Sequence, residues 1–215
     1  MTQWFHQRAS RVSLLLAGLL LSAAPLATFA QSNPLPAPMT KEEAKEHIEE
    51  ESIYPIAGNL AGMIMNGRID DVRAMLAVGV NPNEKTDLPH SVIKLATMSC
   101  SGRTVPVADI VTMIQVLARG GATVNPQNAD GSPMITAAQQ CPAPVVKALL
   151  AVGGDKAART TQGFTPLSMA LIVKNYDAAK VLIAAGATIS KEAAAKLTGS
   201  STDAQGKELI KQATK

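Results

Sequence analysis

Histidine and cysteine are the residues of this chain best suited to chemistry, and both are scarce. Beyond residue 30 the histidines are His47 and His90, and the cysteines of the whole chain are Cys100 and Cys141. Neither histidine belongs to a motif such as Gly-x-Ser-x-Gly or His-Glu-x-x-His. Without a nucleophile, a base and an orienting group in a pattern, the sequence predicts no enzymatic activity. It predicts no metal or other cofactor either, because a zinc site needs several Cys and His at close spacing.

The first thirty residues have the pattern of a secretory signal peptide. Arg8 and Arg11 precede an apolar run over 12–21, and residues 28–30 form a small-x-small cleavage site. We therefore expect residues 1–30 to be removed and the mature protein to lie in the periplasm of a bacterium. No membrane insertion is expected after cleavage, because no later apolar stretch approaches the ~20 residues of a membrane span. The alternative is an uncleaved anchor helix, for which the apolar run is short.

Removal of the signal segment leaves a chain that is nearly neutral. The full sequence has 20 basic and 17 acidic residues. The segment contains Arg8 and Arg11 and no acid, so the mature chain has 18 basic residues against 17 acidic ones. Nucleic-acid binding requires a basic face that neutralises phosphates. The charge balance therefore predicts no nucleic-acid partner.

The mature chain begins with a proline-rich linker, residues 31–39, which cannot hold a helix. Thr40 with Glu43 has the pattern of a capping box and predicts a helix start. Six glutamates within residues 41–51 make this first helix acidic. We interpret residues 40–57 as a polar N-terminal capping helix; a dedicated acidic binding tail is the alternative.

From about residue 58 the chain repeats itself with a period of 33 residues. Gly153 and Gly186 are 33 residues apart, and each follows an aliphatic helical segment. The same interval separates Ser132-Pro133 from Thr165-Pro166, where proline suits the first position of a helix. Each helix pair is too small to bury its apolar face alone, so the pattern predicts an all-α stack of helix pairs.

These repeats resemble the ankyrin repeat, a β-turn followed by two antiparallel helices with the start signature Thr-Pro-Leu-His-x-Ala. Residues 163–170 read Gly-Phe-Thr-Pro-Leu-Ser-Met-Ala, and residues 66–76 match the turn and second helix of a first repeat. The resemblance covers residues 58–190. It implies an ankyrin-repeat solenoid of about four repeats between the N-terminal capping helix and C-terminal capping helices at 191–215. Ser190 and Asp203 are the expected starts of these C-terminal helices.

The second repeat is longer than the others. Gly79 and Gly121 are 42 residues apart, nine more than the period. We expect the extra residues to form a loop over 101–109, with Arg103 at its tip, between the two helices of this repeat. Long loops on repeat scaffolds are often functional, and Arg103 would meet an acidic partner.

Cys100 and Cys141 occupy the same position in neighbouring repeats, since each lies eight residues after a helix start, at Val92 and Pro133. In an exported chain such a pair predicts one disulfide. Packed helices lie about 10 Å apart, whereas bridged Cα atoms normally lie within ~7 Å. The insertion after Cys100 therefore has to supply slack. Two free cysteines and a redox switch are the alternatives.

The ankyrin resemblance also implies a binding surface on the concave face, made of hairpin tips and exposed positions on the first helices. Phe164 with Ile172 and Val173 is the expected anchor, because aromatic side chains commonly dominate interface energies. The alternative is that Phe164 packs against a neighbouring hairpin. Met65 and Met98 are either adaptable contacts or core filler. The helix positions are Met65, Asn66, Met98, Ser99, Gln139, Gln140, Ile172 and Val173, and the tip positions are Asp87, Leu88, His90, Ala129, Asp130, Thr161, Gln162 and Phe164.

These features favour a non-catalytic, monomeric protein that binds another protein in the periplasm. The favoured role is an inhibitor of the immunity type that occludes a toxin. The alternative is a stress-related factor that stabilises or assists a periplasmic enzyme such as a peroxide-removing one, as some similar ankyrin proteins are thought to do. An enzyme would require a compact polar pocket that these residues do not supply.

Overall fold

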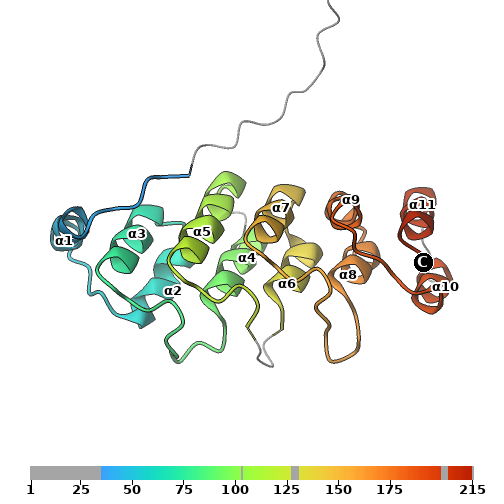
Figure 1. Ribbon diagram of the computed structural model, residues 1–215, viewed down its shortest axis with the longest axis horizontal. Coiled ribbons are helices and arrows are strands. Elements are labelled where there is room, and N and C mark those ends of the chain that lie inside the picture. The colour runs from blue at the N-terminus through green and yellow to red at the C-terminus, as the bar shows by residue number, and fades with distance from the viewer. Residues whose placement is uncertain (1–34, 103, 127–130, 200–202, 215) are drawn as a thin grey trace, which may run out of the picture. The chain divides into compact units, whose positions relative to one another are not determined.

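The computed structural model describes residues 35–102, 104–126, 131–199 and 203–214. The predicted signal peptide and the tip residues Arg103, Ala129 and Asp130 lie outside the described residues. The described ranges form eleven helices and no strand, apart from an isolated bridge between Ile189 and Thr214, and the predicted all-α class is confirmed. The helices are α1 (Lys41–Glu50), α2 (Ala57–Met65), α3 (Ile69–Ala77), α4 (Val92–Gly102), α5 (Val107–Arg119), α6 (Pro133–Gln140), α7 (Ala143–Ala151), α8 (Pro166–Ile172), α9 (Tyr176–Ala184), α10 (Lys191–Gly199) and α11 (Ala204–Ala213) (Figure 1).

The helices lie in two layers. In the first-helix layer, α2, α4, α6, α8 and α10 pack on one another in chain order. In the second-helix layer, α1, α3, α5, α7, α9 and α11 do the same (Figure 1). Each helix from α2 onward also packs on its partner across the layers, as α2 does on α3. A single cluster of buried apolar side chains extends from Ile53 to Ala213, so neighbouring pairs share one core.

Side-chain caps fix where several helices begin, as the sequence predicts. The Thr40 hydroxyl accepts from the backbone N–H of Glu43 at 3.2 Å, and the Glu43 carboxylate accepts from the N–H of Thr40 at 2.8 Å. This reciprocal pair satisfies two backbone donors at the start of α1. Ser132 and Thr165 cap α6 and α8, each ahead of a proline at the first helical position.

Polar helices cover both ends of the stack. At the N-terminal end, the helix is shorter than the predicted capping helix of residues 40–57. The first helix ends at Glu50 rather than near residue 57. Ser52 has a φ of 53°, and a non-glycine residue in this left-handed conformation does not continue a right-handed helix. The chain then enters α2 at Ala57. At the other end Ser190 and Asp203 cap the starts of α10 and α11.

The insertion in the second repeat lengthens both of its helices. The prediction of a loop over 101–109 is wrong at both ends, because α4 continues to Gly102 and α5 begins at Val107. Helix α4 has 11 residues and α5 has 13, against 8 in α6 and 9 in α7. The four added residues of α5 make about one turn, so its buried face stays in phase. Val105, between the helices, is buried, and the absence of a side chain at Gly67 leaves room for its methyl groups.

Candidate interaction surface

Asparagine side chains connect the loops that carry the predicted tip residues. The side-chain amide of Asn83 donates to the carbonyl of Gly121 at 2.8 Å. Its oxygen accepts from the backbone N–H of Thr123 at 2.7 Å. One repeat later Asn125 makes the same pair of bonds around Gly153. This link was not predicted from the sequence, although both asparagines lie four residues after a glycine turn, at Gly79 and Gly121. These bonds set the spacing between successive tip loops.

The loop before α8 is closed by its own backbone. Thr160 donates from its N–H to the carbonyl of Phe164 at 2.9 Å, and its hydroxyl accepts from the N–H of Phe164 at 3.0 Å. Gly163 has a φ of 83°, a conformation that glycine adopts without strain. This turn leaves Thr161 and Gln162 exposed at the tip.

Phe164 is half-buried, in contrast to the exposed position expected for an anchor. It lines a hollow of about 290 Å³ between the loop and α10, together with Ile189, Ala193 and Leu197. The alternative prediction was that Phe164 packs against a neighbouring hairpin. The residues that share the hollow with Phe164 include residues of helix α10.

The predicted helix positions form a row along the first-helix layer. They lie near or just after the C-terminal ends of α2, α4, α6 and α8, which pack in succession. Met65 at one end of the row is 47% exposed, and Ile172 and Val173 at the other end are 45% and 40% exposed. Asn66 and Gln139 are also exposed. The row is therefore apolar at its two ends and polar in its middle.

Two residues in the middle of this row, Ser99 and Gln140, form hydrogen bonds within the protein. Ser99 is buried, and its hydroxyl donates to the carbonyl of Leu95 at 3.3 Å. Ser99 therefore does not reach the surface that was predicted to include it. The Gln140 side chain accepts from the Ser101 hydroxyl at 2.7 Å and donates to the carbonyl of Thr97 at 3.4 Å, which fixes its orientation. Met98, the neighbour of Ser99, is half-buried against the core, in agreement with the core-filler alternative.

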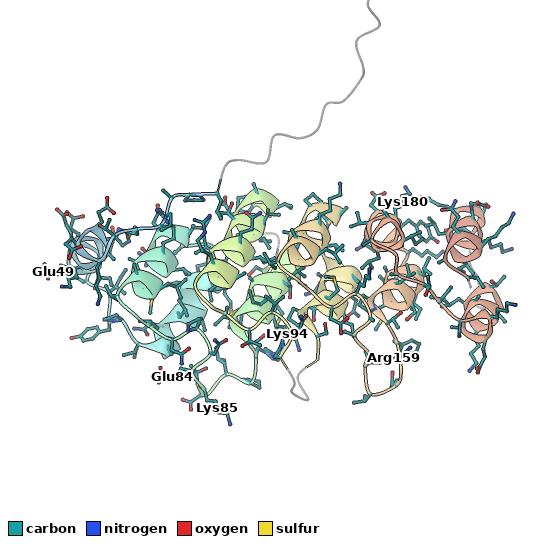
Figure 2. The ribbon with its side chains drawn as sticks, viewed as in Figure 1. Glu49, Glu84, Lys85, Lys94, Arg159 and Lys180 are labelled. Atoms are coloured by element: carbon teal, nitrogen blue, oxygen red, sulfur yellow. A yellow bond between two sulfur atoms is a disulfide. The ribbon has the colours of Figure 1, made fainter. Side chains whose placement is uncertain are left out.

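The first tip loop encloses a hollow of about 460 Å³ with α2 and α4. Leu88 and His90 line this hollow, with Leu60 at its apolar wall. Leu88 and Asp87 are exposed and His90 is half-buried. Figure 2 shows Glu84 on the first tip loop, beside the neighbouring lysine, so charges of both signs face outward there.

A comparison with protein families identifies the repeats. Residues 105–193 match the family model of ankyrin repeats, in three copies. Residues 105–193 contain ankyrin repeats. The pair α2 and α3, which precedes the matched residues, continues the same two-layer packing. No curated protein matches the chain. Ankyrin repeats generally serve as non-catalytic interaction modules, which indicates a role in protein–protein interaction.

Cys100 and Cys141 have the geometry of a disulfide between two neighbouring helix pairs of the stack. Their Cα atoms are 5.2 Å apart, within the normal range for a bridge and well below the helix spacing that made the pairing difficult to predict. Cys100 lies in the last turn of the lengthened α4. Cys141 is the C-cap of α6 and has extended backbone angles. The bridge thus joins two helix ends beyond the region where the helices pack side by side.

A buried carboxylate fastens α1 to α3, in the first helix pair of the stack. Asp71 of α3 is 4% exposed, and its Oδ1 lies 2.7 Å from Nε2 of His47 on α1. Arg68 forms an ion pair with the same carboxylate and lies 3.1 Å from Glu51. His47, which the sequence offered as a group capable of chemistry, is therefore a structural partner of Asp71.

A second clamp fastens α11 to the last ankyrin repeat. The hydroxyl of Tyr176 on α9 donates to Asp203 at 2.8 Å, and Asp203 also accepts from the N–H of Gly206 at 2.9 Å. The Gly206 hydrogen bond, followed by that of Tyr176, holds the pKa of Asp203 below its ordinary value. Partial desolvation, with the bond to Asp203, raises the pKa of Tyr176.

In the ranges that the structure describes, no group of three or more His, Cys, Asp and Glu side chains is placed to hold a metal ion. No helix within the same ranges is long and apolar enough to cross a membrane.

Proposed function

We propose that this protein is an exported, non-catalytic ankyrin-repeat protein that binds another protein through its first-helix layer and tip loops. The observation that carries the proposal is the exposure of Ile172 and Val173 side by side at the end of α8. Met65 is exposed at the equivalent end of α2. Exposed apolar side chains that become desolvated on binding are typical anchors of protein interfaces.

The pattern of a signal peptide supports a periplasmic location, and a disulfide fits an oxidising compartment. Within this setting the favoured role is that of an immunity-type inhibitor, which covers the active surface of a toxin. The second candidate is a stress-related factor that stabilises a periplasmic enzyme such as a peroxide-removing one. Both roles rest on analogy at the level of the fold, and the identity of the partner distinguishes them.

The experiment is affinity capture with mature residues 31–215 from periplasmic extract, followed by mass spectrometry. The test variant carries Ile172→Lys and Val173→Lys. The matched control is Val107→Lys, an exposed valine at the start of α5 and outside the row. Far-UV circular dichroism verifies that both variants remain helical.

We expect the unmodified chain and the Val107→Lys control to retain one stoichiometric protein and the test variant to lose it. With the purified partner, the dissociation constant should rise at least about thirtyfold, the loss expected of a hot spot worth ~2 kcal/mol. Equal capture by all three chains would contradict the proposed surface. A toxin as the partner would support the inhibitor role, and a housekeeping enzyme would support the second candidate.

A further inference from the structure

The proline-rich linker is packed against the second-helix layer. Residues 35–39 form neither helix nor strand. Leu35 packs against the buried core, and the following residues line a hollow of about 180 Å³. The other walls of this hollow are Leu76 and Ala77 of α3 and Val116 of α5. Figure 1 shows the segment running from α1 across α3 toward α5.

Two arginines from different helices bind consecutive carbonyl groups of this segment. Arg73 of α3 donates to the carbonyl of Ala37 at 2.6 Å, and Arg119 of α5 donates to the carbonyl of Pro36 at 2.9 Å. The carboxylate of Asp70 lies 2.5 Å from Arg73 and orients its guanidinium. Both arginines therefore bind the backbone of the segment rather than its side chains, one from α3 and the other from α5.

The chemistry of the segment explains this mode of contact. Prolines alternate at positions 34, 36 and 38. Each proline fixes its own φ and favours an extended conformation in the preceding residue. An extended proline-rich chain has no internal hydrogen bonds, so its carbonyls are available to external donors and its rings to apolar surface. Known receptors for such chains offer aromatic-lined grooves. The surface between α3 and α5 offers aliphatic side chains with two arginine donors beside them instead.

We propose that the groove between α3 and α5, lined by Arg73, Leu76, Val116 and Arg119, is a binding site for extended proline-containing peptides. Residues 35–38 of the chain itself are the ligand that occupies it in cis. Because the segment is attached to α1, its effective concentration is on the order of millimolar, so a free peptide enters only when the segment is displaced. The groove belongs to the second-helix layer, so this proposal stands independently of the partner surface on the other layer.

The test uses a fluorescent synthetic peptide of residues 31–39 as the probe. It is titrated into the unmodified chain 31–215 and into a chain of the same length in which residues 34–39 are replaced by a Gly-Ser sequence. We expect the peptide to bind the replaced chain at least about tenfold more tightly, because its groove is vacant. In the replaced chain, Arg73→Ala with Arg119→Ala should weaken binding at least about tenfold, whereas Lys180→Ala, on α9 (Figure 2), should leave it unchanged.

Further measurements keep the test decisive. Circular dichroism verifies that each chain is folded, and a milder variant with Pro36→Ser and Pro38→Ser replaces the Gly-Ser chain if the latter unfolds. A probe peptide with all its prolines changed to serine should lose binding. The proposal is overturned if neither folded variant binds the peptide, if the unmodified chain binds it equally well, or if loss of both arginines has no effect.

Discussion

The side-chain amide of Asn125 donates to the carbonyl of Gly153 in the next repeat at 2.8 Å. Asn83 and Gly121 are related in the same way one repeat earlier. In each case the glycine has a positive φ, which turns its carbonyl toward the preceding loop. Asn83 and Asn125 therefore each join two successive loops by side-chain hydrogen bonds.

Asn125→Ala should lower the free energy of unfolding by about 1–2 kcal/mol, because it removes two hydrogen bonds between repeats. Asn125→Asp keeps the acceptor and loses the donor, so its effect should be smaller. Urea denaturation measures both. Thr161→Ala, at an exposed loop tip, is the control and should have little effect. If Asn125→Ala were no worse than this control, the loop link would not contribute to stability.

Reduction of the Cys100–Cys141 disulfide should lower the free energy of unfolding by about 4 kcal/mol in the chain-entropy model, given a sequence separation of 41. The measurement is urea denaturation with and without a reductant. A Cys100→Ala and Cys141→Ala double variant is the control and should not respond to the reductant. Under denaturing conditions the unreduced protein should react with no alkylating agent. Two alkylated cysteines in that sample would rule out the bridge.

Asp71→Ala should destabilise the protein by about 1–3 kcal/mol, because it removes the buried carboxylate that holds α1 through His47. The neighbouring Asp70→Ala is the matched control; its side chain is largely exposed, and exposed ion pairs contribute little. Limited proteolysis between α1 and α2 should become faster in Asp71→Ala alone. The same acceleration in both variants would show that the buried pair has no special role.

The contribution of ionised Asp203 should depend on pH. Its pKa is lower in the folded protein than the ordinary value of 3.8, so its ionised form stabilises the fold. This stabilisation is fully present above the ordinary pKa and is lost as the pH falls through the lower folded value. The difference in melting temperature between the unmodified chain and Asp203→Asn should therefore shrink on acidification.

Tyr176→Phe provides the control for that titration. It removes one of the hydrogen bonds that lower the Asp203 pKa, so an NMR titration should show the carboxyl pKa moving up toward its ordinary value. An unchanged carboxyl pKa in Tyr176→Phe would mean that the hydroxyl does not act on Asp203.

The features that the sequence predicted well are local ones. Thr40 and Glu43 are three residues apart, and Ser132 is adjacent to Pro133, so the chemistry that starts each helix is contained in a few neighbouring residues. The 33-residue period likewise required only the positions of glycines and aliphatic residues. The longer α5 was not predicted, because the extra residues were expected to form a loop, although Ile110, Met113, Ile114 and Leu117 follow a helical spacing and are all buried.

The features that were not predicted depend on which distant residues meet. Phe164 is half-buried because α10 lies beside its loop, and no local pattern reports that contact. The bond from Arg119 to Pro36 joins residues 83 positions apart. The linker residues were correctly expected to avoid helix, but the surface that binds them is assembled from α3 and α5 only after folding.

The disulfide lies in the middle of the stack, between α4 and α6. Because each helix packs mainly on its neighbours, local opening can start at either end without disrupting the centre. The Cys100–Cys141 bridge fastens α4 to α6 and keeps these two repeats together during such opening. Met65 on α2 and Ile172 on α8 lie on opposite sides of this fastened pair. Local opening at either end would therefore separate the Met65 end or the Ile172 end of the proposed binding row from the stack, while α4 and α6 stay joined.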